Sequence, residues 1–287
     1  MHASSPLKLP KTPTRLPEDP SKLTLNPPKF LQLEIPLPPM EEQSRIIAKI
    51  DVIAEKLSQA KSIRVQAENA AQSLIWSICE FYLKKCTTIA DSQPLQLLVE
   101  PDRGISYGVV QTGKEHDGGI LTLRAGDLRW FALKTDNIKK VDPAIEEPYR
   151  RTRLHGGELL LRIRGGVGEL AVCPPELRDG NVSREIAVIP FRDVVDPRFA
   201  MFMLAAPTIQ ARMRGHVRGT SYVGINLKDV RTIQIPVPDI KQQMCTVNEI
   251  LALQEKADAV NRLQANISSQ LDAMIPSVLH RAFSGGL

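Results

Sequence analysis

One eleven-residue pattern occurs twice in the sequence, and its two copies lie 200 positions apart. Residues 33–43 read LEIPLPPMEEQ, residues 233–243 read IQIPVPDIKQQ, and the two align without a gap. Both copies place Ile-Pro-x-Pro ahead of a glutamine, Gln43 or Gln243. Solenoid proteins repeat every roughly 20–50 residues. The spacing of 200 positions between the two copies therefore excludes a solenoid. We therefore expect one structural unit to occur twice, with a large insertion between its copies.

A helix can begin directly after each copy of the pattern. Proline cannot join a central strand and keeps the residue before it out of the helical region, so the prolines end an extended segment. In the first copy, Glu41 and Glu42 would lie in the first helical turn, where carboxylates complement the helix dipole. In the second copy, Asp239 has the residue type and position of an N-cap.

The residues that follow show a heptad pattern, with apolar positions alternately four and three apart. The first seam is Ile46, Ile50, Ile53, Leu57, Ala60, Arg64, Ala67, Ala71, Leu74, Ile78 and Phe81. The second seam, 200 residues on, is Thr246, Ile250, Leu253, Ala257, Val260, Gln264, Ile267, Leu271, Met274, Val278 and Arg281.

These seams predict two long helices, residues 41–84 and 240–283, that pack antiparallel along their apolar faces. The polar exceptions Arg64 and Gln264 would then lie near the middle of the pair. Pro276 should bend the second helix near its end. The alternative is two amphipathic helices packed on separate cores.

Between the two helices the heptads disappear, and glycine, proline and short β-type runs take over. Four runs read as strands, bounded by glycine-containing turns such as Gly165-Gly166: residues 119–127, 157–166, 169–175 and 185–191. Residues 197–214 favour a helix that Pro207 interrupts. The expected fold class is therefore α+β, with one mixed β-rich domain flanked by two long helices that form an antiparallel coiled coil.

The middle of the chain is rich in arginine. Residues 87–238 contain 16 Arg against 5 Lys, while the whole chain has a formal net charge of +5 and a pI of about 9.0. The arginine fork suits phosphates and guanine edges. The candidate DNA-binding residues are Tyr107, Arg124, Arg151, Arg153, Arg162, Arg164, Arg218, Thr220, Ser221 and Tyr222. The alternative is that the arginines are solvated or pair with local carboxylates.

The sequence argues against several catalytic or cofactor-binding functions. There is no Walker A sequence, and no pair of the five histidines or four cysteines has metal-ligand spacing. The NPPK at 26–29 places Lys29 where an amino-methyltransferase motif needs an aromatic residue that stacks on a flipped base. The GVGELA at 166–171 fits a hairpin turn better than a dinucleotide loop, because prolines follow it. We expect a binding protein with no metal and no cofactor.

Targeting features are also missing from the sequence. No apolar run approaches the ~18 residues of a membrane helix, and residues 1–20 contain no apolar signal region. Scattered cysteines are typical of a reducing compartment. The sequence therefore predicts a cytoplasmic protein without membrane contact.

Three segments carry a resemblance to a known family. IPLPPMEEQSRIIAKID (35–51), GTSYVGINLKDVRTIQIPVPDIKQQ (219–243) and LHRAFSGGL (279–287) resemble conserved regions of type I restriction–modification specificity subunits, the HsdS family. Between them, ISYGVVQTG, LRAGDL and GGELLLRIRGGVGELAVCP resemble a target recognition domain. The resemblance covers nearly all of the chain from about residue 26 onward, with the segments in the family's order.

The resemblance implies that the protein is a non-catalytic DNA-recognition subunit. In such subunits each recognition domain is followed by a long helix, and each domain reads half of a gapped DNA site. The implied partners are double-stranded DNA, modification (methyltransferase) subunits and a restriction (translocase/endonuclease) subunit. On this view the Ile-Pro-x-Pro segment connects a recognition domain to its spacer helix.

The resemblance also sets the expected domain boundaries. Residues 1–30 would be a poorly ordered remnant or linker, 31–86 the first Ile-Pro-x-Pro segment with its helix, 87–238 the recognition domain, and 239–287 the second helix. At positions 19–21 the chain reads Asp-Pro-Ser where residues 219–221 read Gly-Thr-Ser. The chain therefore resembles the C-terminal half of a specificity subunit.

Several alternatives remain at the level of sequence. The chain could be an inactive truncated remnant, a coiled-coil adaptor that binds protein instead of DNA, or a half-subunit that forms a homodimer within the complex. A two-fold dimer would present identical domains, and its target would be a gapped palindrome. A stand-alone methyltransferase would need a cofactor loop that the sequence does not contain.

Overall fold

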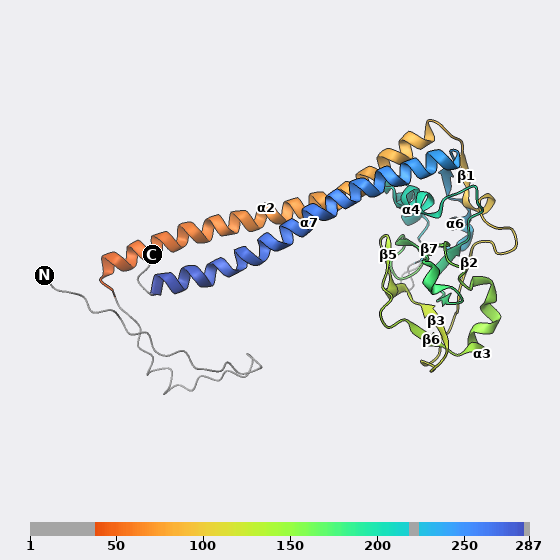
Figure 1. Ribbon diagram of the computed structural model, residues 1–287, viewed down its shortest axis with the longest axis horizontal. Helices are drawn as coiled ribbons and strands as arrows, with labels where there is room; N and C mark the ends of the chain where they lie inside the picture. Colours follow the sequence, from red (N-terminus) through yellow and green to blue (C-terminus); the bar gives the residue numbers. More distant parts are fainter. Residues whose placement is uncertain (1–37, 218–223, 284–287) are drawn as a thin grey trace. The chain divides into compact units, whose positions relative to one another are not determined.

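The computed structural model describes residues 38–217 and 224–283. They fall into two compact units, one holding the described residues of Met1–Leu57 and Asp272–Leu287, the other Ser58–Leu271. The mixed domain and the adjoining parts of both long helices belong to the second unit (Figure 1). No helix among the described residues is long and apolar enough to cross a membrane.

Along the sequence, two long helices flank a region whose helices are short. The α-helices are α2 (Met40–Thr87), α3 (Pro143–Glu146), α4 (Pro197–Ala205), α5 (Pro207–Gly215), α6 (Leu227–Thr232) and α7 (Ile240–Phe283). The 3₁₀ helices are η2 (Leu95–Leu97), η3 (Ala125–Asp127), η4 (Glu147–Thr152) and η5 (Pro175–Leu177). Both predicted long helices are confirmed, and Pro207 ends one short helix and begins the next as expected.

The strands are short, and all of them lie between the long helices. They are β1 (Ser92–Pro94), β2 (Ser106–Tyr107), β3 (Ile120–Leu123), β4 (Leu128–Arg129), β5 (Ala132–Leu133), β6 (Lys139–Val141), β7 (Leu159–Arg162), β8 (Leu170–Val172), β9 (Asn181–Val182), β10 (Ile186–Ile189) and β11 (Gln234–Pro236). Each of the four runs predicted as strands contains one. The predicted fold class, a mixed domain flanked by two long helices, is confirmed.

A four-stranded antiparallel sheet with the order β2-β10-β7-β8 forms the centre of the domain. A second sheet has the order β6-β3-β9, in which β3 and β9 are parallel, while β4 pairs with β5 and β1 with β11. The hairpin between β7 and β8 contains Gly165, Gly166 and Gly168, all at positive φ. A hairpin turn at 165–168 is thus confirmed.

The central sheet is buried on both faces, so its strands read as apolar runs and not as alternating ones. Leu159 and Leu161 of β7 join the core that contains α4, whereas Leu160 between them joins a second core with Leu123 and Leu128. Residues Phe199 to Ala205 of α4 are all buried. Helices cover one face of the sheet, and the smaller sheet covers the other.

Within the second unit, α2 and α7 form an antiparallel pair. The C-terminal part of α2 meets the N-terminal part of α7, where the Tyr82 hydroxyl donates a 2.7 Å hydrogen bond to Glu249. Lys85 lies 3.7 Å from the same carboxylate. Burial and the bond to Glu249 raise the pKa of Tyr82 to about 12, so the hydroxyl stays a donor at neutral pH.

The predicted seam of α2 is only partly correct. Ile46, Ile50, Ile53, Leu57, Ala60, Arg64, Ala67 and Ile78 are buried or half-buried. Leu74 and Phe81 are instead 45% and 60% exposed. Here the buried face moves by one residue, to Ile75, Cys79, Tyr82 and Cys86, because α2 packs on the mixed domain as well as on α7.

The second seam deviates in a similar way. Thr246 and Ile250 are buried and Ala257 is half-buried, whereas Ile267 and Met274 are 50% and 44% exposed. The side chain of Gln264 lies outside the described residues. The Tyr82–Glu249 contact sets a register in which Arg64 would face residue 267, about one turn from Gln264. Close opposition of Arg64 and Gln264 stays a prediction, as does the bend at Pro276.

An aromatic cluster and one carboxylate connect α2 to the domain. Trp76 of α2 stacks edge-on against Trp130 at 4.4 Å between ring centroids, in the turn between β4 and β5, and Phe131 continues the cluster. Glu80 accepts hydrogen bonds from the backbone N–H and the hydroxyl of Thr208, at 3.0 and 2.6 Å. Thr208 lies in the first turn of α5, so α2 supplies the carboxylate that satisfies this helix end.

In both copies of the repeated segment, the glutamine side chain makes the same hydrogen bond. Gln43 donates to the carbonyl of Pro38 at 2.7 Å, and Gln243 donates to the carbonyl of Pro238 at 2.8 Å. Gln243 is fully buried and also bonds the backbone of residues 194 and 196. Asp239 caps α7 as predicted, since its carboxylate accepts from the N–H groups of Lys241 and Gln242.

We expect Gln243→Ala to lower the free energy of unfolding by about 1–3 kcal/mol, because it removes the three hydrogen bonds that this fully buried side chain makes with the N–H of Asp196 and the carbonyls of Val194 and Pro238. The matched control is Gln43→Ala, which removes a single described bond at a half-buried position and should cost less than about 1 kcal/mol. Urea denaturation of both variants measures this. Equal losses would contradict the assigned role of Gln243.

Candidate nucleic-acid interface

One end of the central sheet gathers several of the predicted DNA-binding residues. Tyr107 ends β2 and pairs with Ala187 of β10, whose next neighbour is Leu161 of β7. Arg162 follows as the last residue of β7. Arg164, two positions on, forms an isolated bridge with Gly224. The sheet thus places Tyr107, Arg162 and Arg164 at the same end although they are far apart in sequence.

Four of the candidates lie outside the described residues: Arg218, Thr220, Ser221 and Tyr222. Their assignment stays a prediction. The described chain stops at Val217 and resumes at Gly224. Gly224, the first described residue after these four, pairs with Arg164 at this end of the sheet.

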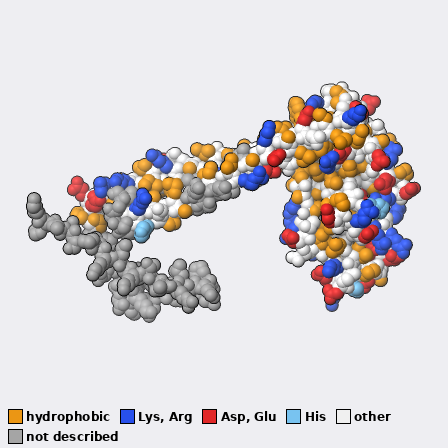
Figure 2. Space-filling view, viewed as in Figure 1, with side chains coloured by type: hydrophobic (Ala, Val, Ile, Leu, Met, Phe, Trp, Pro, Cys, Tyr) orange, Lys and Arg blue, Asp and Glu red, His pale blue; other side chains and the backbone are white. Residues whose placement is uncertain are grey.

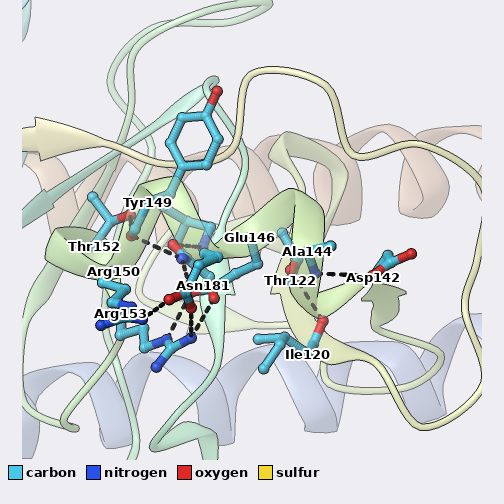
Figure 3. A network of polar contacts seen from close by, with 12 residues as sticks. Ile120, Thr122, Asp142, Ala144, Glu146, Tyr149, Arg150, Thr152, Arg153 and Asn181 are labelled. Atoms are coloured by element: carbon cyan, nitrogen blue, oxygen red, sulfur yellow. Dashed lines mark hydrogen bonds and ion pairs between the residues drawn. The ribbon is translucent and has the colours of Figure 1, made fainter.

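Arg153 belongs to a buried polar network (Figure 3). Its guanidinium donates to both carboxylate oxygens of Glu146, at 2.8 and 2.5 Å, and Glu146 is fully buried. Asn181 donates to the same carboxylate at 2.7 Å and to the carbonyl of Tyr149 at 3.1 Å. Burial acts to raise the pKa of Glu146, but the bonds from Arg153 and Asn181 outweigh it and hold that pKa below its usual value. The network of Arg153, Glu146 and Asn181 thus joins α3, η4 and β9.

Arg162 is also engaged within the protein. It lies 2.5 Å from Glu169 across the β7–β8 hairpin and donates to the carbonyls of Arg164 and Gly165. Its side chain is 20% exposed. It therefore organises the hairpin turn next to Arg164.

Arg124 has a weaker partner. Its Nε is 3.4 Å from Asp127, and the side chain is 49% exposed. The backbone N–H of Arg124 donates to the same carboxylate at 2.8 Å, which starts η3. Because this ion pair is long and half-exposed, it should contribute little, and the guanidinium is available for other contacts.

Arg151 and Arg164 differ from the other three described arginine candidates. Neither forms an ion pair with a carboxylate of the described residues. Arg151 is exposed and makes one long bond, 3.4 Å, to the carbonyl of Arg103. Arg164 is half-buried at the sheet end. The alternative of pairing with local carboxylates thus holds for Arg153 and Arg162, whereas Arg151 and Arg164 keep their charge uncompensated.

Two further arginines, which the sequence did not single out, lie near this region. Arg103 belongs to the loop that leads into β2, and its carbonyl accepts a hydrogen bond from Arg151. Arg231 donates a 2.7 Å hydrogen bond to the carbonyl of Ile105 in the same loop. Lys and Arg side chains gather along the margin of the domain where Figure 1 draws β2 and α3 (Figure 2). The only sequence signal for them was the general excess of arginine.

Histidine, cysteine and acidic side chains are the usual metal ligands and nucleophiles in proteins. Among residues 38–217 and 224–283, no three His, Cys, Asp or Glu side chains gather as a metal site requires. Burial raises the pKa of the Cys79 and Cys173 thiols to about 12, which makes both poor nucleophiles at neutral pH. The described side chains thus offer an arginine-bearing surface for a polyanion.

The second unit thus combines a mixed domain, which carries this surface, with the adjoining parts of two antiparallel helices. In sequence, the chain is similar to two specificity subunits of type I restriction enzymes. It is 23% identical over 276 residues to the EcoBI specificity subunit of Escherichia coli, and 24% identical over 276 residues to the EcoKI specificity subunit of Escherichia coli strain K12. The alignments cover 88% and 89% of this chain.

Two solved structures share the fold. One, described under "Structural basis underlying complex assembly and conformational transition of the type I R-M system", has a TM-score of 0.62 at 20% identity, over 88% of this chain and 62% of that chain. The HsdS subunit from Thermoanaerobacter tengcongensis has a TM-score of 0.51 at 19% identity, over 88% and 61%. No protein-family model matches the sequence.

The resemblance inferred from the sequence motifs is therefore confirmed: the chain is similar to type I specificity subunits along most of its length. It spans 58% of the length of each of the two curated relatives. That share agrees with the expected likeness to about half of a specificity subunit.

Proposed function

We propose that the protein is a DNA-binding specificity subunit of a type I restriction–modification system, and that its mixed domain recognises one half-site of duplex DNA. The observation that carries the proposal is the sheet end at Tyr107 and Arg164. There an exposed aromatic ring lies at the same end of the sheet as an arginine that has no carboxylate partner among the described residues and that pairs with Gly224. Arginine contacts to phosphate give affinity, and a few contacts to base edges give sequence choice.

The chain would leave catalysis to other subunits. Its partners would be modification subunits that methylate DNA and a restriction subunit that translocates and cleaves it. Exposed apolar side chains on α2 support the docking of protein partners: Ile63, Leu74 and Phe81 are 67%, 45% and 60% exposed. Spacings of eleven and seven residues place them on one helix face.

Light scattering with and without a modification subunit tests whether two copies of the chain associate. A monomer in both states would exclude the homodimer.

Duplex binding at rising salt tests the DNA-recognition proposal. We expect the full chain to bind a 30-base-pair duplex with an affinity whose logarithm falls linearly with the logarithm of salt, by about 0.9 units for each phosphate contacted. Contact with about three or four phosphates would give a slope near −3. The control is Arg45→Ala, which removes a charge from α2 outside the domain and should leave the slope unchanged.

The adaptor alternative predicts a different outcome. An adaptor whose middle domain binds protein would show affinity for duplex that is weak at all salt concentrations and equally sensitive to Arg45→Ala and to domain substitutions. That result would contradict the proposed function. Binding of S-adenosylmethionine by the isolated chain would instead support the methyltransferase alternative.

A further inference from the structure

A hollow of about 210 Å³ lies at the edge of the central sheet next to β2. Its lining comes from three segments: the stretch from η2 to the start of β2, the end of η4, and the last turn of α6. The polar side chains among its lining residues are Gln96, Glu100, Arg103, Ser106, Arg151 and Arg231. Three arginines around one small hollow raise the question of what balances their charge.

Only one of these arginines is neutralised by the protein. Arg103 lies 2.8 Å from Glu158, which is 3% exposed, and 3.7 Å from Glu100. It also donates to the carbonyl of Arg153 at 2.8 Å, and its own side chain is 13% exposed. Arg103 therefore holds the loop against the domain and has little capacity left for a ligand.

The other two guanidinium groups are free of carboxylates among the described residues. Arg151 donates to the carbonyl of Arg103 at 3.4 Å, and Arg231 donates to the carbonyl of Ile105 at 2.7 Å. These two carbonyls are two residues apart on one short loop, so the guanidinium groups flank the same stretch of backbone. Both arginines are exposed, so a ligand can reach their remaining N–H groups.

One lining residue, Ser106, has a polar atom without a hydrogen-bond partner in the described part of the chain. The Oγ of Ser106 is buried and makes no hydrogen bond to the described residues. A buried hydroxyl without a partner costs about 1–3 kcal/mol, so such groups usually have a ligand or water to bond. The hollow thus holds two guanidinium groups without carboxylate partners among the described residues, and a tetrahedral phosphate oxyanion accepts hydrogen bonds from such groups.

We propose that this hollow binds a backbone phosphate of the DNA, with Arg151 and Arg231 as the charged donors. The proposal rests on the proposed function and adds a phosphate site to it. Tyr107 directly follows Ser106 in β2, so a phosphate here would be adjacent to the sheet end where Tyr107 and Arg164 lie. A phosphate contact fixes the register of the duplex and carries no sequence information itself.

The test is duplex binding by the full chain with Arg151→Ala and with the double variant Arg151→Ala/Arg231→Ala, between about 50 and 200 mM salt. Each lost arginine should reduce the magnitude of the salt slope by about 0.9. The loss of affinity should be the same factor for the preferred duplex and for a scrambled one. The control Arg178→Ala removes an equal charge from an exposed residue outside the hollow and should not change the slope.

Folding of the variants needs its own check, because Arg231 also supports the loop at Ile105. The melting temperature and the fluorescence of Trp76 and Trp130, the only two tryptophans, provide it. Arg151→Ala removes only one long bond and keeps the proposal testable if the double variant unfolds. Arg151→Lys keeps the charge and should retain most of the slope.

Three outcomes would contradict the proposed phosphate site. A slope that both variants leave unchanged, while the wild type keeps its own, would overturn the phosphate site and leave the proposed function intact. A loss confined to the preferred duplex would mean that these arginines read bases, which also overturns it. A wild-type chain without salt-dependent duplex binding would overturn the proposed function and this site together.

Discussion

Replacing Glu146 with alanine is expected to lower the free energy of unfolding by about 3 kcal/mol. Removing one partner of a buried ion pair costs roughly 3–5 kcal/mol, since the other charge is left uncompensated. The lower end applies because the Arg153 side chain is 33% exposed and can turn toward water. The amide of Asn181 would lose one of its two acceptors as well.

The next residue provides a matched control. Glu147 also forms ion pairs, one with Arg150 and one with Arg153 at 3.5 Å. Its side chain, however, is 46% exposed. Exposed ion pairs contribute about 0–1 kcal/mol, so Glu147→Ala should hardly change stability. Urea denaturation at pH 7 compares the two variants, and similar losses would contradict the importance of burial for this network.

The same network predicts a pH dependence. The folded-state pKa of Glu146 is lowered from its ordinary value of 4.5, so the unfolded chain binds the proton more readily. Its stabilising contribution is therefore present above about pH 4.5 and is lost as the pH falls through the lower folded-state pKa. The difference in stability between wild type and Glu146→Gln should shrink below pH 4.5. A difference that stays constant from pH 7 to pH 3 would show that the carboxylate charge does not matter.

How far the sequence predicts this fold depends on the range of the interactions involved. The long helices, the four main strands and the break at Pro207 follow from local periodicity and from proline and glycine, so they could be predicted. The exposure of Leu74 and Phe81 could not, because it follows from where α2 packs on the domain. A heptad pattern alone does not contain that tertiary contact.

The candidate site shows the same division. Arginine enrichment located the domain that carries the charge, but it did not separate free from engaged side chains. The pairing of Arg153 with Glu146 depends on how the chain turns from α3 through η4, and the pairing of Arg162 with Glu169 depends on a hairpin. Arg231 approaches Ile105 from a residue 126 positions away in sequence, which no local pattern indicates.

Replacing Arg164 is expected to have the largest effect on sequence discrimination. A guanidinium that bonds a guanine edge through its fork contributes about 1–3 kcal/mol of discrimination against the wrong base. Arg164 is suited to this role because it is half-buried at the sheet end, with no ion pair to a described carboxylate. Arg164→Ala should bind preferred and scrambled duplexes with more similar affinity than the wild type does.

A conservative variant separates base recognition from phosphate contact at this position. Arg164→Lys keeps the positive charge but loses the planar fork, so it should retain the salt slope while losing the discrimination. If Arg164 contacts phosphate instead, Arg164→Lys would behave like the wild type toward all duplexes. Competition binding with a preferred and a scrambled duplex distinguishes these outcomes.

The central claim is that the mixed domain reads the sequence of duplex DNA, and selection from a pool of random duplexes tests it most directly. The full chain should enrich one short motif of a few base pairs, and Arg164→Lys should relax the preference at one position within that motif while leaving the others. Enrichment of no motif by the wild-type chain, together with equal retention of all sequences, would contradict the account.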